Sequence, residues 1–529
     1  MDKQMFIEGR KFEKHKQDDR RCLKLLAAFA IIVFSVVGSV VQIQMFWLTT
    51  GEKVSVRAPS VKSFRVGVFE KKLVSVKNAK TRKEAMVAIH ENLAHIERQA
   101  KIAHEQGVSF LVLPEYGITG EMPEHFNERS SLYPYMEQVP AVSMSHPACI
   151  NCKWMHHGVE GQASIGCMAL KYDMYILANL VESVPCDIKL DSLCPSDHHY
   201  QYSTNIVYDP QGCLVAKYRK YYLIGEESAK FDRPSEPMHV YFDTNYGRFG
   251  TMTSMDALFA EPGIGLVEKF AIDHLLLPIY WKSISVYQQA VNWQIAFSTK
   301  NNINLIAANV YNPARNIFGS SILCGPRVVN ITSQTNSSSG ILLTGDLPSN
   351  KPLARQQAVS LKDCSIDTSS NNLMTETVII DGDIFDAIVL QGLNGTAKVC
   401  QNTTCCQVKY TRNATKDTYI VSAFQGMHSS LPQLASEICL VSKCQNETLS
   451  SCGNNEVTTS TTFSHLTLSA SISVQHIYPI VLPFDNDYKS HLNWTFRQCA
   501  PKNAVVSSSK WPVVALGMVG RDFAKDSFI

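Results

Sequence analysis

The hydrophobic positions between about residues 62 and 310 alternate between strand-like and helix-like spacing. Ser63–Phe69 and Ser109–Leu113 are short runs of apolar and β-branched residues, which are typical of buried strands. Between them, Arg82–Gln106 carries apolar residues three and four positions apart, and Gly107 follows where this pattern stops. The alternation predicts an α/β domain built from strand–helix units.

The α/β pattern continues to about residue 310. It predicts a helix at Ser285–Thr299 and further strands at Met174–Leu180, Asn205–Tyr208, Gly212–Lys217, Phe249–Thr253, His274–Pro278 and Ile303–Asn309.

The composition changes in the second half of the chain. Between about residues 330 and 372, Ser, Asn, Thr, Gly and Pro dominate, which predicts a long loop and then a linker. From Thr375 onward, short β-rich runs alternate with cysteines, which predicts a mostly β domain held by disulfides.

The N-terminal region contains one long apolar segment. Leu25–Leu48 is 24 residues long and uncharged, and a helix that spans a bilayer needs about 20 apolar residues. Several Lys and Arg residues precede it, and such residues stay on the cytoplasmic side. We therefore expect a cytoplasmic segment at 1–24, a transmembrane signal anchor at 25–48 and a type II membrane protein with an extracellular or luminal ectodomain. A cleaved signal peptide, followed by secretion, is the alternative.

Cysteines and glycosylation motifs indicate the same compartment. The 16 cysteines, most of them beyond residue 148, are typical of an oxidising environment. Seven N-x-[ST] sequons predict a glycoprotein, at Asn330, Asn336, Asn394, Asn402, Asn413, Asn446 and Asn493. The net charge of +2 lacks the basic excess of a nucleic-acid-binding protein, so no nucleic-acid partner is predicted. The sequence does not indicate which protein, if any, is a partner.

Two arrangements of cysteines leave alternatives open. Cys149 and Cys152, followed by two histidines, fit either a zinc site or a disulfide-bonded extracellular loop, and the loop is favoured. The adjacent Cys405 and Cys406 cannot easily bond to each other, so each is expected to reach a separate partner, with candidates at Cys400, Cys439, Cys444 and Cys452. With one cysteine on the cytoplasmic side, 15 remain, which predicts one free thiol or one intermolecular bond. No metal or cofactor is predicted.

Three polar positions stand at the ends of strand-like runs, where active-site residues often lie in α/β folds. Glu115 ends "LVLPEYG", Lys220 lies in "LVAKYRKYYLIGEE", and Ser254 lies in "FGTMTSMD". Taken singly, each has an ordinary explanation. The glutamate fits a surface or capping residue, the lysine fits a solvated edge, and the serine fits a helix N-cap.

Together, these motifs resemble the vanin/biotinidase branch of the nitrilase superfamily of carbon–nitrogen hydrolases. That family uses a Glu–Lys–Cys triad. Its glutamate follows a proline at a strand end, as Glu115 does, and its lysine lies in "Y-x-K-x-x-L" before "G-E", as Lys220 does. Its cysteine follows "F-G-x-x-T", where this chain has Ser254. Similarity extends from about residue 62 to about 480 and includes "YQYSTNIVYD", "EPGIGLVEKF" and "VCQNTTCCQVKY".

The resemblance implies a fold and a domain division. The expected architecture is α/β: a nitrilase-type four-layer αββα sandwich at 62–350, a linker at 351–371 and a C-terminal β-rich, disulfide-stapled domain at 372–529. It also implies pairing of a cysteine in the 149–152 region near Cys167, and the spacing of Cys186 and Cys194 is similar to that of this branch.

The resemblance also implies a role for each site residue. Glu115 is the expected general base, and Lys220 is expected to stabilise the oxyanion together with the backbone N–H of Met255. Glu226 is expected to hold Lys220, and Trp281 to line the pocket or to be a buried core residue. Asp256 is expected to orient the helix that follows it.

Ser254 separates three functional hypotheses. A serine hydroxyl is far less acidic than a thiol and normally needs a histidine or lysine base. The first hypothesis is therefore a vanin-like glycoprotein with impaired catalysis that acts by binding a ligand or partner. The second is an active amidase for pantetheine- or biotin-amide-like substrates with Ser254 as nucleophile. The third is a structural membrane glycoprotein with a degenerate pocket.

Overall fold

The protein was analysed as a computed structural model that describes residues 61–529 with gaps. The segments outside the description are 1–60, 77–78, 121–127, 144–147, 153–157, 284, 333–339, 351–365, 367–374, 432–433, 455–457, 484–493, 501–502, 509–511 and 528–529. The predicted span at 25–48 lies outside the described residues. No helix within the described part is long and apolar enough to cross a bilayer.

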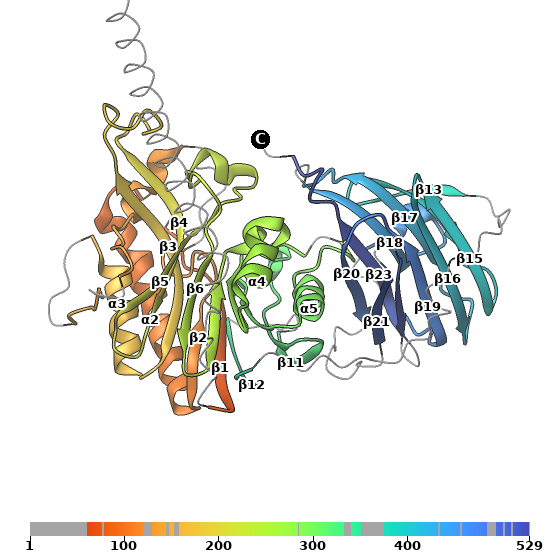
Figure 1. Cartoon of the computed structure of the whole chain (residues 1–529), viewed down its shortest axis with the longest axis horizontal. Helices are drawn as coiled ribbons and strands as arrows, with labels where there is room; N and C mark the ends of the chain where they lie inside the picture. Colours follow the sequence, from red (N-terminus) through yellow and green to blue (C-terminus); the bar gives the residue numbers. More distant parts are fainter. Residues whose placement is uncertain are drawn as a thin grey trace, which may run out of the picture. The chain divides into compact units, whose positions relative to one another are not determined.

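The first sheet has six strands, and two helices cover its outer face (Figure 1). The helices are α2 (Arg82–Glu105) and α3 (Glu160–Lys171). In spatial order the strands are β12 (Gly340–Pro348), β1 (Ser63–Lys71), β2 (Val108–Val112), β3 (Tyr175–Pro185), β4 (His199–Tyr208) and β5 (Leu214–Arg219). Thr81 and Glu84 form a capping box at the start of α2, and its buried stripe includes Ile89 and Ile96.

The second sheet also has six strands and packs face to face on the first. Its strands are β11 (Arg327–Ile331), β10 (Ser321–Cys324), β9 (Asn304–Ala308), β8 (His274–Pro278), β7 (Gly247–Thr251) and β6 (Val240–Thr244). Phe110 of the first sheet stacks on Phe249 of the second, with ring centroids 4.2 Å apart. On the other face of the second sheet lie α4 (Gly265–Phe270) and α5 (Ala290–Asn301). The order helix, sheet, sheet, helix is the predicted four-layer arrangement.

Two predictions about secondary structure are wrong in detail. The stretch from 330 onward, predicted as a loop, contains β12, which pairs antiparallel with β1 from Ser63↔Pro348 to Lys71↔Gly340. β12 contains a short apolar run, Ile341–Leu343, between polar residues, and this run is sufficient for it to pair as the edge strand of the first sheet. The helix predicted from Ser285 begins at Ala290, because the preceding residues form turns.

The C-terminal part consists of two packed antiparallel sheets. One contains β13 (Glu376–Ile380), β14 (Asp383–Val389), β17 (Tyr419–Met427), β18 (Ala435–Lys443), β23 (Val513–Arg521) and β20 (His476–Pro483). The other contains β15 (Asn394–Gln401), β16 (Thr404–Arg412), β19 (Phe463–Ser471), β22 (Asn503–Ser508) and β21 (Trp494–Ala500). Alternate residues of both sheets fill the core between them, as the β-rich prediction implied.

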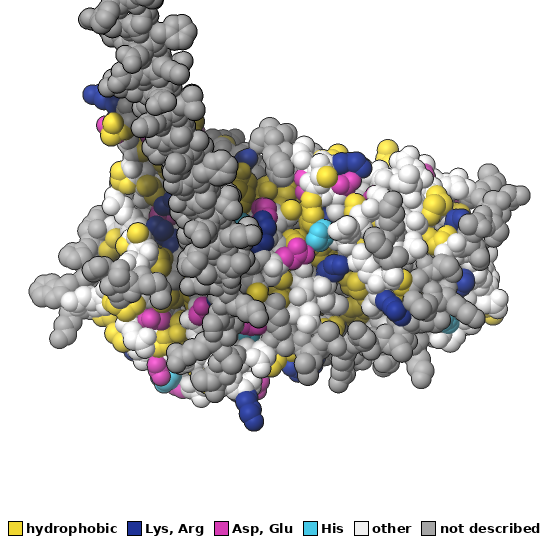
Figure 2. Space-filling model, in the orientation of Figure 1, with side chains coloured by type: hydrophobic (Ala, Val, Ile, Leu, Met, Phe, Trp, Pro, Cys, Tyr) yellow, Lys and Arg dark blue, Asp and Glu magenta, His cyan; other side chains and the backbone are white. Residues whose placement is uncertain are grey.

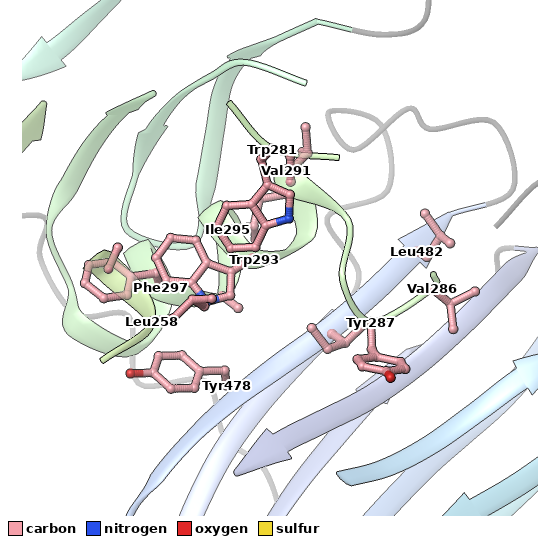
Figure 3. Close-up of a cluster of buried hydrophobic side chains, with 14 of the residues drawn as sticks. Leu258, Trp281, Val286, Tyr287, Val291, Trp293, Ile295, Phe297, Tyr478 and Leu482 are labelled. Atoms are coloured by element: carbon pink, nitrogen blue, oxygen red, sulfur yellow. The ribbon is translucent and has the colours of Figure 1, made fainter. Parts of the chain in front are cut away.

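Helix α5 packs against this second region through a shared apolar cluster (Figure 3). Phe297 of α5 stacks on Tyr478 of β20, with centroids 6.4 Å apart. The ring centroids of Tyr287, just before α5, and Phe385 of β14 are 6.0 Å apart. The nitrilase-like region and the C-terminal sheets are therefore joined by a continuous core.

Disulfides follow the expected pattern. The pairs are Cys149–Cys213, Cys152–Cys167, Cys186–Cys194, Cys400–Cys405, Cys406–Cys439 and Cys444–Cys452, and Cys499 is also disulfide-bonded. The vicinal cysteines thus reach separate partners. Cys149 and Cys152, which the sequence left open as zinc ligands, are both in disulfides and therefore cannot bind a metal as thiolates. Among the described cysteines, Cys324 is free and buried.

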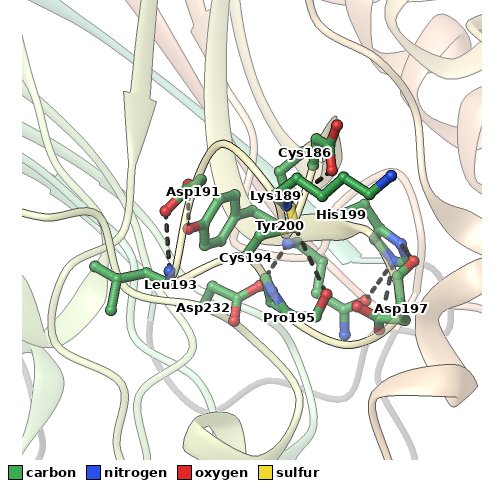
Figure 4. Close-up of a disulfide and its surroundings, with 12 residues drawn as sticks. Cys186, Lys189, Asp191, Leu193, Cys194, Pro195, Asp197, His199, Tyr200 and Asp232 are labelled. Carbon is green, nitrogen blue, oxygen red and sulfur yellow. Dashed lines mark hydrogen bonds and ion pairs between the residues drawn. A yellow bond between two sulfur atoms is a disulfide. The ribbon is translucent and has the colours of Figure 1, made fainter.

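The Cys186–Cys194 loop shows how a disulfide organises a surface turn (Figure 4). Asp191 accepts hydrogen bonds from the backbone N–H of Leu193 at 3.0 Å and from the hydroxyl of Tyr200 at 2.7 Å. The loop presents Leu190 and Leu193 to solvent.

The sequons fall into three groups. Asn394, Asn402, Asn413 and Asn446 are exposed, so a glycan has access to each. Asn330 is half-buried and donates to the backbone carbonyl of Thr344 at 3.0 Å, which makes it a poor acceptor in the folded chain. Asn336 and Asn493 lie outside the described residues.

Candidate active site

The three residues of the predicted triad meet at adjoining strand ends. Glu115 follows β2 and Lys220 follows β5 in the first sheet, whereas Ser254 follows β7 in the second. The hydroxyl of Ser254 donates to Glu115 Oε2 at 2.6 Å, and Lys220 Nζ donates to Glu115 Oε1 at 2.9 Å. All three side chains are buried. The packing of the two sheets therefore brings together three residues that are 139 positions apart at most.

The backbone fixes the hydroxyl of Ser254. Its φ of +45° lies in the left-handed region, which is unusual for a residue with a side chain. The backbone N–H of Tyr280, just after β8, donates to Ser254 Oγ at 2.8 Å. Oγ thus accepts one hydrogen bond and donates another to Glu115. Strained residues of this kind concentrate at functional sites.

The charges of the site form a carboxylate–ammonium–carboxylate group, in which Glu115 and Lys220 are buried and Glu227 is partly exposed. Lys220 contacts Glu227 Oε1 at 2.6 Å as well as Glu115, and the hydroxyl of Tyr116 donates to the same Glu227 oxygen at 2.6 Å. Burial raises the pKa of Glu115. Burial alone would lower the pKa of Lys220, but the two carboxylates outweigh it and hold that pKa above its usual range. Lys220 therefore stays an ammonium group, and Glu115 is a stronger base than an ordinary carboxylate.

Glu226 does not hold Lys220, contrary to the prediction. The short helical turn Gly225–Ala229 directs the Glu226 side chain outward, where it is 53% exposed and pairs with Lys230 at 3.4 Å. Its neighbour Glu227 takes the predicted role. The sequence "IGEES" contains both glutamates. Which of them contacts Lys220 depends only on the direction of the helical turn.

Asp256 has a different role from the predicted one. It is fully buried and accepts hydrogen bonds from the backbone N–H groups of Tyr221 and Tyr222 and from the hydroxyl of Tyr218. It therefore fixes the segment on both sides of Lys220 rather than the helical turn that follows Ser254. Burial raises the pKa of Asp256 to about 7.

A cavity of about 460 Å³ opens onto Ser254 and Lys220. Met255 lines it, and the predicted oxyanion role of the Met255 N–H stays a prediction. Trp281 also lines it although only 4% of its surface is exposed, so it is both a wall residue and a core residue. The C-terminal sheets contribute His428, Ser436, Tyr478 and Arg521 among others. No motif marks these residues, because they come from segments of the chain far from the nitrilase-like region.

A polar network behind the cavity positions Trp281. Asn309 bonds the backbone N–H of Trp281 through Oδ1 at 3.0 Å and its carbonyl through Nδ2 at 3.1 Å. The hydroxyl of Ser320 accepts from the Asn309 N–H at 2.8 Å and donates to Glu70 Oε2 at 2.7 Å. Glu70 Oε2 also accepts from Gly319 and Thr332, whereas Oε1 finds no hydrogen-bond partner among the described residues.

Glu70→Gln is expected to stabilise the protein at neutral pH. Burial raises the pKa of Glu70 to about 7, so the folded chain retains a proton that the unfolded chain loses near pH 4.5. Wild-type stability should therefore fall as pH rises from 4.5 through 7, by up to about 3 kcal/mol from this group. Glutamine keeps the acceptor oxygen and carries no charge. Urea unfolding should show equal stabilities near pH 4.5 and a more stable variant at pH 8.

The exposed Glu105→Gln, at the end of α2, is the control and should change stability little at either pH. A Glu70→Gln effect that is the same at both pH values would contradict a buried, proton-retaining Glu70.

Known proteins resemble this chain over most of its length. The carbon-nitrogen hydrolase family model matches residues 83–269, and the vanin C-terminal domain model matches residues 377–526. Mouse pantetheinase is 31% identical over 487 residues, covering 89% of this chain and 91% of its own; the human pantetheinase is 30% identical with the same coverage. Pufferfish (Takifugu rubripes) biotinidase is 31% identical, covering 79% and 86%. A solved Nesterenkonia amidase aligns with a TM-score of 0.39 at 18% identity, over 56% of this chain and 94% of its own.

The family match covers most of the two-sheet region, which therefore has the fold of a carbon–nitrogen hydrolase. The relatives share both halves of the chain, including the C-terminal sheets. The chain therefore belongs to the vanin/biotinidase branch of the nitrilase superfamily.

Proposed function

We propose that this protein binds small amides in the cavity above Ser254 and hydrolyses them poorly or not at all. The observation that carries the proposal is the hydrogen-bonding state of Ser254, whose hydroxyl is bonded to Glu115 while Lys220 is held as an ammonium group. The likeness of "FGTMTSMD" to the motif of the family supports Ser254 as the counterpart of its nucleophilic cysteine. This chain would thus retain the base and the oxyanion donor without the thiol.

The chemistry of the two nucleophiles differs. A thiol has a reference pKa near 8.5, so a nearby carboxylate with a raised pKa can take its proton. A serine hydroxyl loses its proton only during attack and usually gives it to a histidine or a neutral lysine. Lys220 cannot act in this way between two carboxylates. A loss of several kcal/mol of transition-state stabilisation is the expected consequence.

The intact ion pair and the open cavity support ligand binding. The buried ion pair and the cavity do not resemble a collapsed, degenerate pocket, which weakens the purely structural hypothesis. The relatives are named for pantetheine and biotin chemistry, so pantetheine and biotinyl amides are the first ligands to test. The disulfides and exposed sequons favour an extracellular or luminal protein, anchored by the predicted helix at 25–48 or secreted.

Ser254→Cys is expected to raise amide hydrolysis at least about 100-fold above wild type, because the base and the cation are already in place. The glycosylated protein would be assayed on pantetheine and on a biotinyl amide, and labelled with a thiol-directed amide inhibitor at residue 254. Ser254→Ala is the control. Wild type should match Ser254→Ala in turnover, and both should bind pantetheine by calorimetry.

Two outcomes would favour the other hypotheses. Wild-type turnover that Ser254→Ala abolishes would show an active serine amidase, which the 2.6 Å contact between Ser254 and Glu115 makes chemically conceivable. Absence of both binding and Ser254→Cys activity would show a structural glycoprotein.

A further inference from the structure

A second serine in the same cavity has the histidine partner that Ser254 lacks. Ser436 lies at the start of β18, and His428 follows β17. The hydroxyl of Ser436 is 2.9 Å from His428 Nε2, and His428 Nδ1 is 2.6 Å from Oδ2 of Asp383 at the start of β14. His428 and Ser436 both line the cavity, although little of either side chain is exposed.

The surroundings of Asp383 set the tautomer of His428. Asp383 accepts from the hydroxyl of Tyr287 at 2.9 Å and from the backbone N–H of Ser429 at 2.7 Å. Burial alone would raise the pKa of Asp383, but its bonds to His428 and these donors hold that pKa below the usual range. An ionised Asp383 requires a proton on Nδ1 of His428. Nε2 is then a lone-pair acceptor for the Ser436 hydroxyl.

We propose that Ser436, His428 and Asp383 form a second nucleophilic centre that cleaves carboxylic esters. Ser436 Oγ would attack the ester carbonyl while its proton passes to His428 Nε2. His428 would return that proton to the leaving alcohol as the C–O bond breaks, which leaves an acyl-Ser436. Water, deprotonated by the same nitrogen, would then release the carboxylic acid and restore the serine.

Arg521 is placed to stabilise the charge that develops in this reaction. Its Nη1 lies 3.4 Å from Ser436 Oγ, and the guanidinium is held by Asp526 at 2.8 Å. A fixed cation this close to Ser436 Oγ would favour loss of the hydroxyl proton and would stabilise negative charge that develops next to it.

The cavity favours small acyl esters as the substrate class. The wall of the cavity includes Leu431, Leu434 and Tyr478, which suit an apolar acyl chain. The volume of about 460 Å³ limits the substrate to a small molecule. Esters are easier to cleave than amides, because an alkoxide leaves more readily than an amide anion. The reaction at this centre uses neither Ser254 nor Lys220, although both line the same cavity as Ser436 and His428.

The same hydrogen bonds could instead only tie the β17–β18 connection to β14, and a fluorophosphonate probe separates the two roles. Full-length glycoprotein would be treated with the probe, and the adduct mapped by peptide mass spectrometry. Labelling of up to one equivalent on Ser436 is expected, and it should be lost in Ser436→Ala. Ser422→Ala removes another buried hydroxyl of the same sheet and is the matched control.

Asp383→Asn gives a readout that a structural role would not move. It is expected to slow labelling by about 10³-fold or more, because the wrong tautomer of His428 is then favoured. A burst of 4-nitrophenol from 4-nitrophenyl butyrate should follow the same ranking of variants. Folded wild type that does not react, or an adduct that maps to Ser254, would overturn the proposal. If Ser436→Ala or Asp383→Asn fails to fold, the mapped wild-type adduct alone decides.

Discussion

Replacing Lys220 by Met is expected to lower the free energy of unfolding by about 3–5 kcal/mol, because it leaves the buried carboxylate of Glu115 and the half-buried one of Glu227 without a cation. Glu115 is fully buried and Glu227 is 21% exposed at its side chain, and each lies within 2.9 Å of Lys220 Nζ. Methionine matches the length of the lysine stem, so the loss reports the charge rather than a cavity. Chemical denaturation at pH 7 measures it.

Two further variants show whether the charge is responsible. Lys101→Met removes an exposed lysine that pairs with Glu105 at 3.9 Å, and should cost only a few tenths of a kcal/mol. Adding Glu115→Gln to Lys220→Met should recover part of the loss, because one orphaned carboxylate disappears. A Lys220→Met protein as stable as wild type would mean that Glu115 is protonated and that no ion pair exists in solution.

Removing the Cys406–Cys439 disulfide is expected to cost about 3–4 kcal/mol. The bond joins β16 of one C-terminal sheet to β18 of the other and closes a loop of 33 residues. Loop closure of that length restricts the unfolded chain by about this amount. Both cysteines are fully buried, so paired alanine substitutions are the least disruptive replacement. Thermal unfolding of the double variant measures the loss.

The Cys186–Cys194 bond is the matched control, since it closes a loop of only eight residues at the surface. Its removal should cost about 1 kcal/mol less, from the dependence of closure entropy on loop length. A larger loss at Cys186–Cys194 than at Cys406–Cys439 would contradict this account of the C-terminal sheets.

Local patterns predicted the strands of the nitrilase-like region well. The predicted strand His274–Pro278 coincides with β8, and the predicted helix from Arg82 coincides with α2, because both carry clear periodicity and a clear end. β12 was missed because its apolar run is short and its strand is specified by pairing with β1, whose residues lie 269 or more positions away along the chain, from Lys71↔Gly340 to Ser63↔Pro348. Pairing over such distances leaves little trace in a local window.

Some residues of the candidate site could be predicted from local sequence, and others could not. Glu115, Lys220 and Ser254 could be found because each follows a strand and matches a motif. Glu227 was passed over for Glu226 because the direction of one helical turn decides between them. His428 and Ser436 carry no motif at all. Their relation to Asp383 exists only after three strands of the C-terminal sheet have paired.

On the face shown in Figure 2, acidic and basic side chains are scattered among hydrophobic and uncharged ones, so charge does not mark a docking surface there. Glycosylation of the predicted sequons would have a more definite effect on one sheet edge. β15 is an edge strand of the five-stranded sheet, and exposed sequon asparagines stand at its first residue, Asn394, and just beyond its last, at Asn402. A glycan at each end would obstruct the approach of a foreign strand to the free backbone groups of β15. Cells that cannot attach N-linked sugar would then produce a chain that folds correctly but self-associates through this edge.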